Sequence, residues 1–124
     1  MVAELECLAS SLMKQIVHVG LAEALTKGPP PPKNLAVPIF SQGSLAVEFY
    51  TPVGYDRQTP HRQDELYFIA RGRALFFDGE KRYPVEPGAF IFVPAGQIHR
   101  FEDFSPDFAA WVVFYGPKRG EPDA

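Results

Sequence analysis

Two histidines and one glutamate lie beside apolar segments, at places where a strand end can present a side chain to a cavity. His99 follows a proline–glycine turn at residues 94–96, which itself ends an apolar run. His61 and Glu65 come just before a second apolar run at residues 66–70. Two imidazoles and a carboxylate are ligands for divalent transition metals, and three ligands on one face of an ion leave positions open for substrate or dioxygen. The sequence therefore predicts a metal site at His61, Glu65 and His99.

Glu65 begins a run in which side chains at every second position share one face of a strand. By this alternation Glu65, Tyr67 and Ile69 point the same way, so Tyr67 lines any cavity that Glu65 faces. An unpaired carboxylate resists leaving water, but a divalent cation or a positive partner removes that penalty. Fe, Mn, Ni and Zn all accept such ligands. The alternative without a metal is a hydrogen-bonded or salt-bridged cavity mouth, in which Glu65 pairs, for instance, with Arg57 or Arg100.

The elements that must position these side chains are short strands. From about residue 35 the chain consists of apolar and aromatic runs separated by turn residues, at the spacing of an all-β sandwich or barrel. The pair Asp78-Gly79 is typical of a tight hairpin, and Gly72 and Gly88 mark further turns. No helical pattern separates these runs, which argues against a parallel α/β sheet. The predicted strands, which we expect to pair antiparallel, cover residues 45–50, 65–70, 74–77, 81–85, 90–93, 99–104 and 108–115.

The segment before residue 35 has a different character. Leucines recur at helical spacing within residues 3–14, and residues 21–27 form a second short helical pattern that ends at Gly28. Four prolines at residues 29–32 predict an extended polyproline II spacer. We therefore expect three parts: a helical extension with a proline-rich linker at residues 1–34, a barrel at residues 35–117 and a polar tail at residues 118–124.

The turn before His99 is part of a longer pattern with fixed spacing. The motif G-x5-P-x-G-x2-H is met by Gly88, Pro94, Gly96 and His99, with Asp103 where an asparagine usually follows. This is the second sequence motif of the cupins, and the chain resembles that family over about residues 45–117. The short segment between the two cupin motifs is similar to that of the compact single-domain microbial cupins.

The first cupin motif, G-x5-H-x-H-x3/4-E-x6-G, is met less completely. His61 stands for its second histidine, Glu65 for its glutamate and Gly72 for its closing glycine, whereas Thr59 replaces the first histidine. Cupin metal sites use the histidines and glutamate of this motif together with the histidine of the second. The resemblance therefore implies His61, Glu65 and His99 as metal ligands.

The threonine leaves one ligand position to be filled, because a hydroxyl binds transition metals far more weakly than an imidazole does. An amide oxygen of Gln58 or Gln63 can take this position, as can water. Strand parity with His61 favours Gln63.

The resemblance implies an all-β fold, a double-stranded β-helix (jelly-roll) cupin barrel with a short N-terminal helical extension. It implies a divalent transition metal (Fe, Mn, Ni or Zn) and a small-molecule ligand. We expect an enzyme acting on a small oxygen-rich substrate by dioxygenase, isomerase or lyase chemistry, with Tyr67 and Gln63 as polar cavity groups. The alternatives are a ligand-binding or sensor cupin without catalysis, and a metal-free epimerase-like enzyme that needs a histidine base, a carboxylate and a tyrosine acid.

Composition narrows the partners and the compartment. The 124 residues are 46% hydrophobic and carry a net charge of -3, which fits one globular domain and offers no basic surface for nucleic acid. Cys7 is the single cysteine, so no intrachain disulfide forms, and we expect a cytoplasmic protein. No apolar run reaches the roughly 18 residues of a membrane span. The last predicted strand is apolar on both faces, and with the family resemblance this predicts a homodimer.

Overall fold

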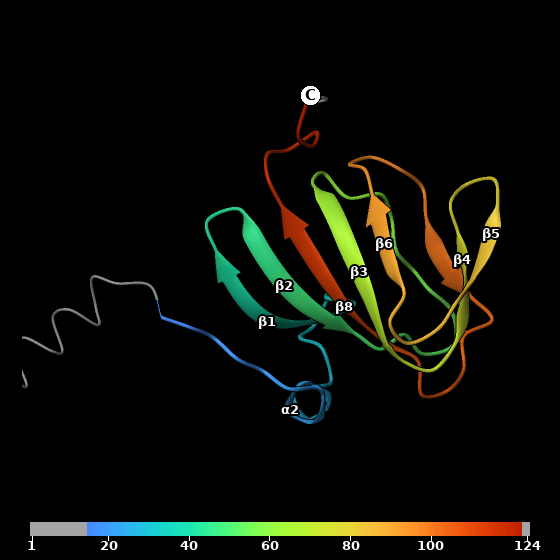
Figure 1. The fold of residues 1–124 in the computed structure, drawn as a ribbon, viewed down its shortest axis with the longest axis horizontal. Helices are drawn as coiled ribbons and strands as arrows, with labels where there is room; N and C mark the ends of the chain where they lie inside the picture. The colour runs from blue at the N-terminus through green and yellow to red at the C-terminus, as the bar shows by residue number, and fades with distance from the viewer. Residues whose placement is uncertain (1–14, 123–124) are drawn as a thin grey trace, which may run out of the picture.

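The protein is an antiparallel β-structure in which two sheets enclose an aromatic core (Figure 1). The computed structural model describes residues 15–122. Its elements are α2 (Leu21–Thr26), β1 (Val37–Gln42), β2 (Leu45–Tyr50), β3 (Asp64–Arg71), β4 (Ala74–Phe77), β5 (Arg82–Val85), β6 (Phe90–Val93), β7 (Arg100–Glu102) and β8 (Ala109–Tyr115).

The larger sheet has five strands in the order β1-β2-β8-β3-β6, and the smaller has three in the order β5-β4-β7. All strand pairs within these sheets are antiparallel. The last strand, β8, lies in the middle of the larger sheet between β2 and β3, so it joins the early and central parts of the barrel. This arrangement confirms the all-β antiparallel fold expected from the sequence. Helix is a minor part of the described chain.

The core forms because side chains alternate between the inside and the outside of each strand. In β3 Tyr67 and Ile69 are buried, whereas Phe68 between them is 43% exposed on the outer face. Tyr67 packs edge-to-face on Phe101 of β7 with ring centroids 5.0 Å apart, and Phe101 packs in the same way on Phe76 of β4 at 5.2 Å. These contacts join the two sheets and place the hydroxyl end of Tyr67 inside the barrel.

All seven predicted strands are present, with bounds that differ by a few residues at most. The sequence analysis missed β1, which contains Pro38. Proline cannot donate a ladder hydrogen bond, and it is tolerated here because β1 is an edge strand whose pairing with β2 is irregular between Pro38 and Phe40.

The predicted helix at residues 21–27 is confirmed as α2 (Leu21–Thr26), and Ala24 of this helix packs against Phe49 and Ala109 on the outer face of the larger sheet. The predicted helix at residues 3–14 lies outside the described residues. The predicted polyproline II segment at residues 29–32 leads into a turn, in which the amide of Asn34 donates to the carbonyl of Pro31. Lys33 has a φ of 71° in this turn.

None of the helices in residues 15–122 has both the length and the apolar composition needed to cross a bilayer.

Candidate metal centre

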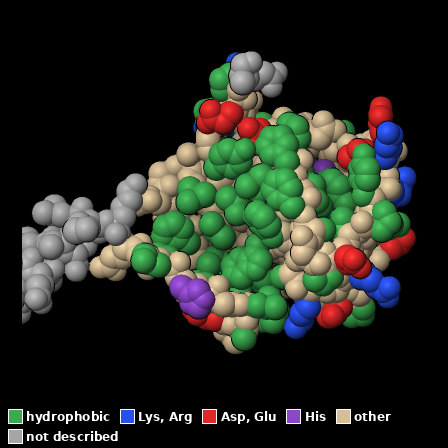
Figure 2. Space-filling view, in the orientation of Figure 1, with side chains coloured by type: hydrophobic (Ala, Val, Ile, Leu, Met, Phe, Trp, Pro, Cys, Tyr) green, Lys and Arg blue, Asp and Glu red, His purple; other side chains and the backbone are tan. Residues whose placement is uncertain are grey.

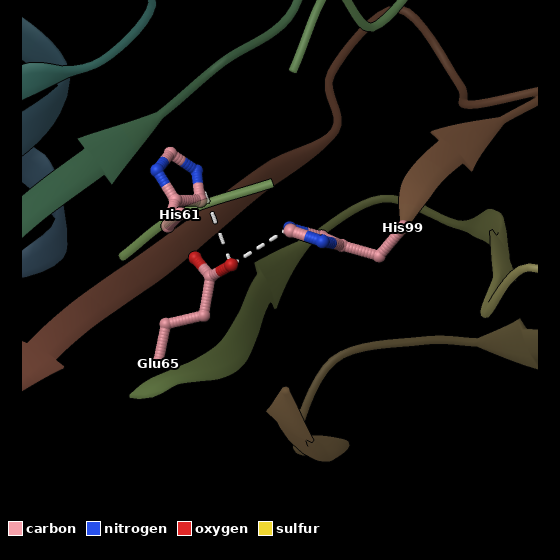
Figure 3. A group of neighbouring side chains, drawn as sticks. All are labelled: His61, Glu65 and His99. Carbon is pink, nitrogen blue, oxygen red and sulfur yellow. Dashed lines mark ion pairs between the residues drawn. The ribbon is translucent and has the colours of Figure 1, made fainter. Parts of the chain in front are cut away.

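The side chains of His61, Glu65 and His99 meet inside one end of the barrel (Figure 3). One ligand atom from each residue lies within 4.8 Å of those of the other two. Oε1 of Glu65 is 2.7 Å from Nε2 of His99 and 3.9 Å from Nε2 of His61. The structure therefore brings together the three residues that the sequence analysis selected, from positions up to 38 residues apart in the chain (99 minus 61).

Two long-range pairings create this meeting point. Glu65, near the start of β3, lies between Val93 of β6 and Phe114 of β8 on the inner face of the larger sheet. The loop that carries His61 is tied to the turn before His99, because the amide of Gly96 donates to the carbonyl of His61 at 2.7 Å. Gly96 has a φ of +80°, a conformation that favours glycine, so the motif glycine makes this turn possible.

Glu65 is a buried carboxylate whose charged partners among the described residues are the two histidines. Its side chain is 1% exposed, and no group among the described residues is aligned to donate a normal hydrogen bond to either of its oxygens. Burying a carboxylate in this way is costly unless a cation or several donors stabilise it. Two imidazole nitrogens beside these oxygens complete a donor set that divalent transition metals accept, so the residues present fit a metal ion.

The tautomer of His99 is set by its neighbours. Nδ1 lies 2.9 Å from the carbonyl oxygen of Gln97, which can only accept, so Nδ1 carries a proton and Nε2 faces Glu65. Burial alone lowers the pKa of His99, but the adjacent Glu65 carboxylate outweighs burial and the pKa is raised. At His61 burial is the largest effect and its pKa is lowered, although Glu65 opposes this. Nε2 is therefore the nitrogen of His99 that faces Glu65, and a metal would take the place of its proton.

A chain of hydrogen bonds leads from the metal centre to Asp56, a residue that the sequence analysis missed. The hydroxyl of Tyr67 lies 3.1 Å from Nε2 of His99 and donates to Oε1 of Gln58 at 2.6 Å. The other end of the Gln58 amide donates from Nε2 to Oδ2 of Asp56 at 2.8 Å. Since Nε2 of Gln58 is committed to Asp56, its oxygen must face Tyr67, and Asp56 fixes the orientation of the whole chain.

Asp56 itself is 8% exposed and accepts four hydrogen bonds. Besides the two from Gln58, they come from the hydroxyl of Tyr50 and from the backbone amide of Phe101. Asp56 lies in an irregular loop between Tyr55 and Arg57, and nothing in the local sequence distinguishes it from an exposed turn residue. Only the pairing of this loop with β7 shows its role.

Gln63, predicted as a further ligand and a polar cavity group, lines the cavity beside His61, but its side-chain amide is bound to the backbone of other segments. Its amide nitrogen donates to the carbonyls of Ser44 and Gly116, both at 2.9 Å, and so joins the loop before β2 to the end of β8. The parity argument fails because β3 begins at Asp64, one residue after Gln63. Gln58 is the amide near the site instead, with Oε1 at 3.4 Å from Nε2 of His61. Thr59 is exposed.

Other charged residues near the site have structural partners. Asp64 is buried and accepts hydrogen bonds from the backbone amides of Ala95 and Glu121. Arg100 pairs with Glu102 at 2.7 Å, and Arg57 stacks over the ring of Tyr55. Neither arginine pairs with Glu65, whose ion-pair partners among the described residues are His99 and His61.

Three cavities border the site. Two of them, of about 430 Å³ and about 610 Å³, open beside His61, and one of about 710 Å³ lies beside His99. The His61 side chain is 33% exposed and the His99 side chain 1%, so His61 is the ligand residue nearest to solvent. The 430 Å³ cavity is lined by Lys33, Glu48, Tyr50, Arg62, Val112 and Phe114, among other residues.

Comparisons with known proteins agree with this geometry. A family model described as the cupin domain matches residues 48–115. A cupin-2 domain protein of Shewanella frigidimarina has a similar fold, with a TM-score of 0.63 at 10% identity, covering 79% of this chain and 94% of that one.

Two curated relatives are closer in sequence. An uncharacterized protein of Streptomyces coelicolor, SCO3923, is 43% identical over 63 residues, which are 51% of this chain and 60% of the relative. The dimethylsulfoniopropionate lyase DddQ of Ruegeria pomeroyi is 31% identical over 87 residues, which are 68% of this chain and 43% of the relative. The crystal structure of that lyase matches with a TM-score of 0.50 and 32% identity, covering 59% of this chain and 39% of that one. The chain thus spans 60% or less of the length of these two relatives.

Proposed function

Because the chain belongs to the cupin family, we propose that it is a metal-dependent enzyme acting on a small, oxygen-rich organic molecule. His61, Glu65 and His99 would hold the ion, and Fe, Mn, Ni and Zn all suit these ligands. The observation that carries the proposal is the buried Glu65 carboxylate, which has no aligned donor among the described residues and lies between two histidines.

A bound metal would supply Lewis acidity, polarising a carbonyl or carboxylate oxygen of the substrate. Tyr67 places a neutral hydroxyl beside this position. Burial and then the charge of Glu65 raise the pKa of Tyr67 well above its usual value, so the hydroxyl stays protonated at neutral pH. Its hydrogen is donated to Gln58, which Asp56 holds in turn, so the Tyr67 oxygen faces the site as an acceptor. The residues of this chain would therefore hold the ion beside a fixed, neutral phenol.

Among dioxygenase, isomerase and lyase chemistry, we favour a lyase. The reason is the resemblance to dimethylsulfoniopropionate lyase, which covers 68% of this chain at 31% identity. In an elimination, a base takes a proton from the carbon next to the carboxylate, the electrons of that C–H bond form the new double bond, and the leaving group departs with its own electron pair. A metal held by these residues would make that proton more acidic by binding the carboxylate.

A metal-free epimerase-like mechanism is the weaker candidate. The pair of His99 and Glu65 with Tyr67 nearby has the required residue types. However, Nδ1 of His99 is bound to a backbone carbonyl and Nε2 faces Glu65, so the ring has no free nitrogen to accept a substrate proton. A ligand-binding cupin without catalysis is favoured by one observation, the replacement of the first motif histidine by the exposed Thr59.

We also propose that two copies associate through the outer face of the larger sheet. Figure 2 shows hydrophobic side chains gathered over this face. Phe68 of β3 and Phe90 and Phe92 of β6 are 43 to 56% exposed there, and the rings of Phe68 and Phe90 lie 5.4 Å apart. Exposed aromatic patches of this kind mark association surfaces. Light scattering should report a dimer for the wild type and a monomer for Phe90→Ser, and a monomeric wild type would refute the association.

The test of the metal proposal uses protein purified without an affinity tag. We expect stoichiometric metal in the wild type and little in His99→Ala, measured by elemental analysis. His18→Ala is the matched control, because His18 is exposed and remote in sequence from the three ligand residues. If neither wild type nor control holds metal, and added Fe, Mn, Ni or Zn does not raise the melting temperature, the proposal fails. Release of dimethyl sulfide from dimethylsulfoniopropionate by the metal-loaded protein then tests the lyase assignment.

A further inference from the structure

Two of the three ligand residues of the metal centre lie outside the strands. Glu65 belongs to β3, whereas His61 and His99 lie in segments without regular secondary structure. The ladders that β3 forms with β6 and β8 hold Glu65, but contacts between loops must hold the two histidines. A site binds its ion tightly only when its ligands are already held in the right geometry. The contacts of these loops therefore bear directly on metal binding.

The spacer between His61 and Glu65, residues 62–64, is bound at every position to the C-terminal segment, residues 116–121. The three hydrogen bonds run from the Arg119 amide to the Arg62 carbonyl at 2.6 Å, from Nε2 of Gln63 to the Gly116 carbonyl at 2.9 Å, and from the Glu121 amide to Oδ2 of Asp64 at 3.0 Å. The pairing of β3 with β8 brings the two segments together, because it ends where Asp64 lies opposite Tyr115. The C-terminal segment is thus attached along the whole spacer.

Asp64 also joins the spacer to the segment that carries the third ligand. This carboxylate is buried, and each of its oxygens accepts from one backbone amide: Oδ1 from Ala95 at 2.9 Å and Oδ2 from Glu121. Ala95 lies in the turn that precedes His99. Hydrogen bonds to an ionised carboxylate are stronger than those between neutral groups. One side chain therefore holds the turn before His99 on one side and the C-terminal segment on the other.

The C-terminal segment approaches Asp64 too closely to carry a side chain at the point of contact. Gly120 has a φ of +82°, a conformation that favours glycine. A Cβ at this position would lie 2.5 Å from Oδ1 of Asp64. The segment is therefore seated directly on the carboxylate, and a substitution at Gly120 displaces one or the other.

We propose that residues 116–121 are part of the metal centre, and that Asp64 is the positioning residue through which they hold His61 and His99 at the separation that one ion needs. Asp64 is not one of the clustered ligand residues, and backbone amides occupy both of its oxygens, so it acts through the loops that it joins. The inference rests on the proposed function, because it concerns the same three ligands, and it adds a segment that lies beyond the last strand.

The test measures Co²⁺ binding to the untagged full chain, by titration and by the visible absorption of the bound ion, at a temperature where every variant is folded. Asp64→Asn has one acceptor oxygen in place of two, and a backbone amide cannot accept in return, so either orientation loses one of the two bonds. Gly120→Ala displaces the segment from the other side. We expect each variant to bind Co²⁺ about tenfold more weakly than the wild type or worse, with an altered absorption spectrum.

The matched control is Gly88→Ala. Gly88 has a φ of +93°, and a Cβ there meets no atom within 4 Å, so this variant carries the same kind of backbone strain away from Asp64. It should lose stability but bind Co²⁺ with the affinity and spectrum of the wild type. Unchanged affinity and spectrum in Asp64→Asn and Gly120→Ala would overturn the inference. An equal loss of affinity in Gly88→Ala would also overturn it, because the effect would then be one of general stability.

Two further measurements keep the inference testable. If Asp64→Asn does not fold, Gln63→Met replaces it, since this change removes only the bonds of the Gln63 amide, and it should also weaken Co²⁺ binding. The rings of His61 and His99 have centroids 5.8 Å apart, so a nuclear Overhauser effect between them reports their separation in metal-free protein. If the wild type binds no metal, the proposed function fails. The loss of this effect in Asp64→Asn and Gly120→Ala would then still support the inference, and its retention would overturn it.

Discussion

Replacing Asp56 by asparagine should destabilise the protein strongly, although the two side chains have the same shape. Each carboxylate oxygen of Asp56 accepts two hydrogen bonds. Oδ1 accepts from the Tyr50 hydroxyl and the backbone N–H of Gln58. Oδ2 accepts from the side-chain Nε2 of Gln58 and the backbone N–H of Phe101. An asparagine NH2 group placed at either oxygen position faces two donors. The Tyr50 hydroxyl and the Gln58 side chain can rotate to accept, but the two backbone amides cannot.

At least one backbone N–H is therefore left unpaired in either orientation of the new side chain. An unsatisfied buried donor costs about 1–3 kcal/mol, and bonds to a charged acceptor contribute about 1.5–3 kcal/mol each. We expect Asp56→Asn to lose about 3 kcal/mol of unfolding free energy, which lowers the melting temperature of a domain of this size by roughly 10 °C.

Urea unfolding measures this loss as a lower midpoint with an unchanged m value. The control is Asp103→Asn, because Asp103 is exposed and asparagine tolerates its positive φ of 48°. A second readout is metal affinity, since an inverted Gln58 amide no longer holds Tyr67 in place. If Asp56→Asn is as stable as Asp103→Asn, the argument that Asp56 organises the site is wrong.

Three further predictions follow from single residues. Glu65→Gln should abolish the metal-dependent rise in melting temperature. In the wild type, a metal concentration 100 times Kd should raise the unfolding free energy by about 2.7 kcal/mol. If the variant keeps this rise, Glu65 is not a metal ligand. Glu48→Gln should be more stable than the wild type at pH 7, because the folded wild type holds a carboxylate whose pKa is raised. As the pH falls to the pKa of the unfolded chain, near 4.5, Glu48 takes up its proton and the difference in unfolding free energy should close. A difference that does not change with pH would contradict this. Gly72→Ala should lower the unfolding free energy by about 3 kcal/mol or more, because a Cβ there lies 2.7 Å from the Phe108 Cα. Gly88→Ala has no atom within 4 Å of its Cβ, so it should lose only about 1–2 kcal/mol, the cost of its positive φ. Equal losses of stability in thermal unfolding would show that packing at Gly72 is unimportant.

Much of the fold was predictable because the rules that form strands are local. Alternating burial in β3 and the turn glycines at Gly72, Gly79 and Gly88 depend only on neighbours in the chain, and each of these glycines has the positive φ that its turn needs. The strand β1 escaped prediction because Pro38 is a poor strand residue unless its strand lies at a sheet edge, and edge position is a property of the whole sheet.

The sequence by itself determined the three residues of the proposed metal centre, because fixed spacing around a turn and a strand start is enough to select His61, Glu65 and His99. The tertiary structure decided what surrounds them: that Gln58 rather than Gln63 approaches the site, that Asp56 is buried under Phe101, and that Glu48 faces the same cavity. These outcomes depend on hydrogen bonds between loops and strands far apart in the chain, such as that from the Gly96 amide to the His61 carbonyl. Their partners have no fixed spacing in the sequence, so no local pattern records them.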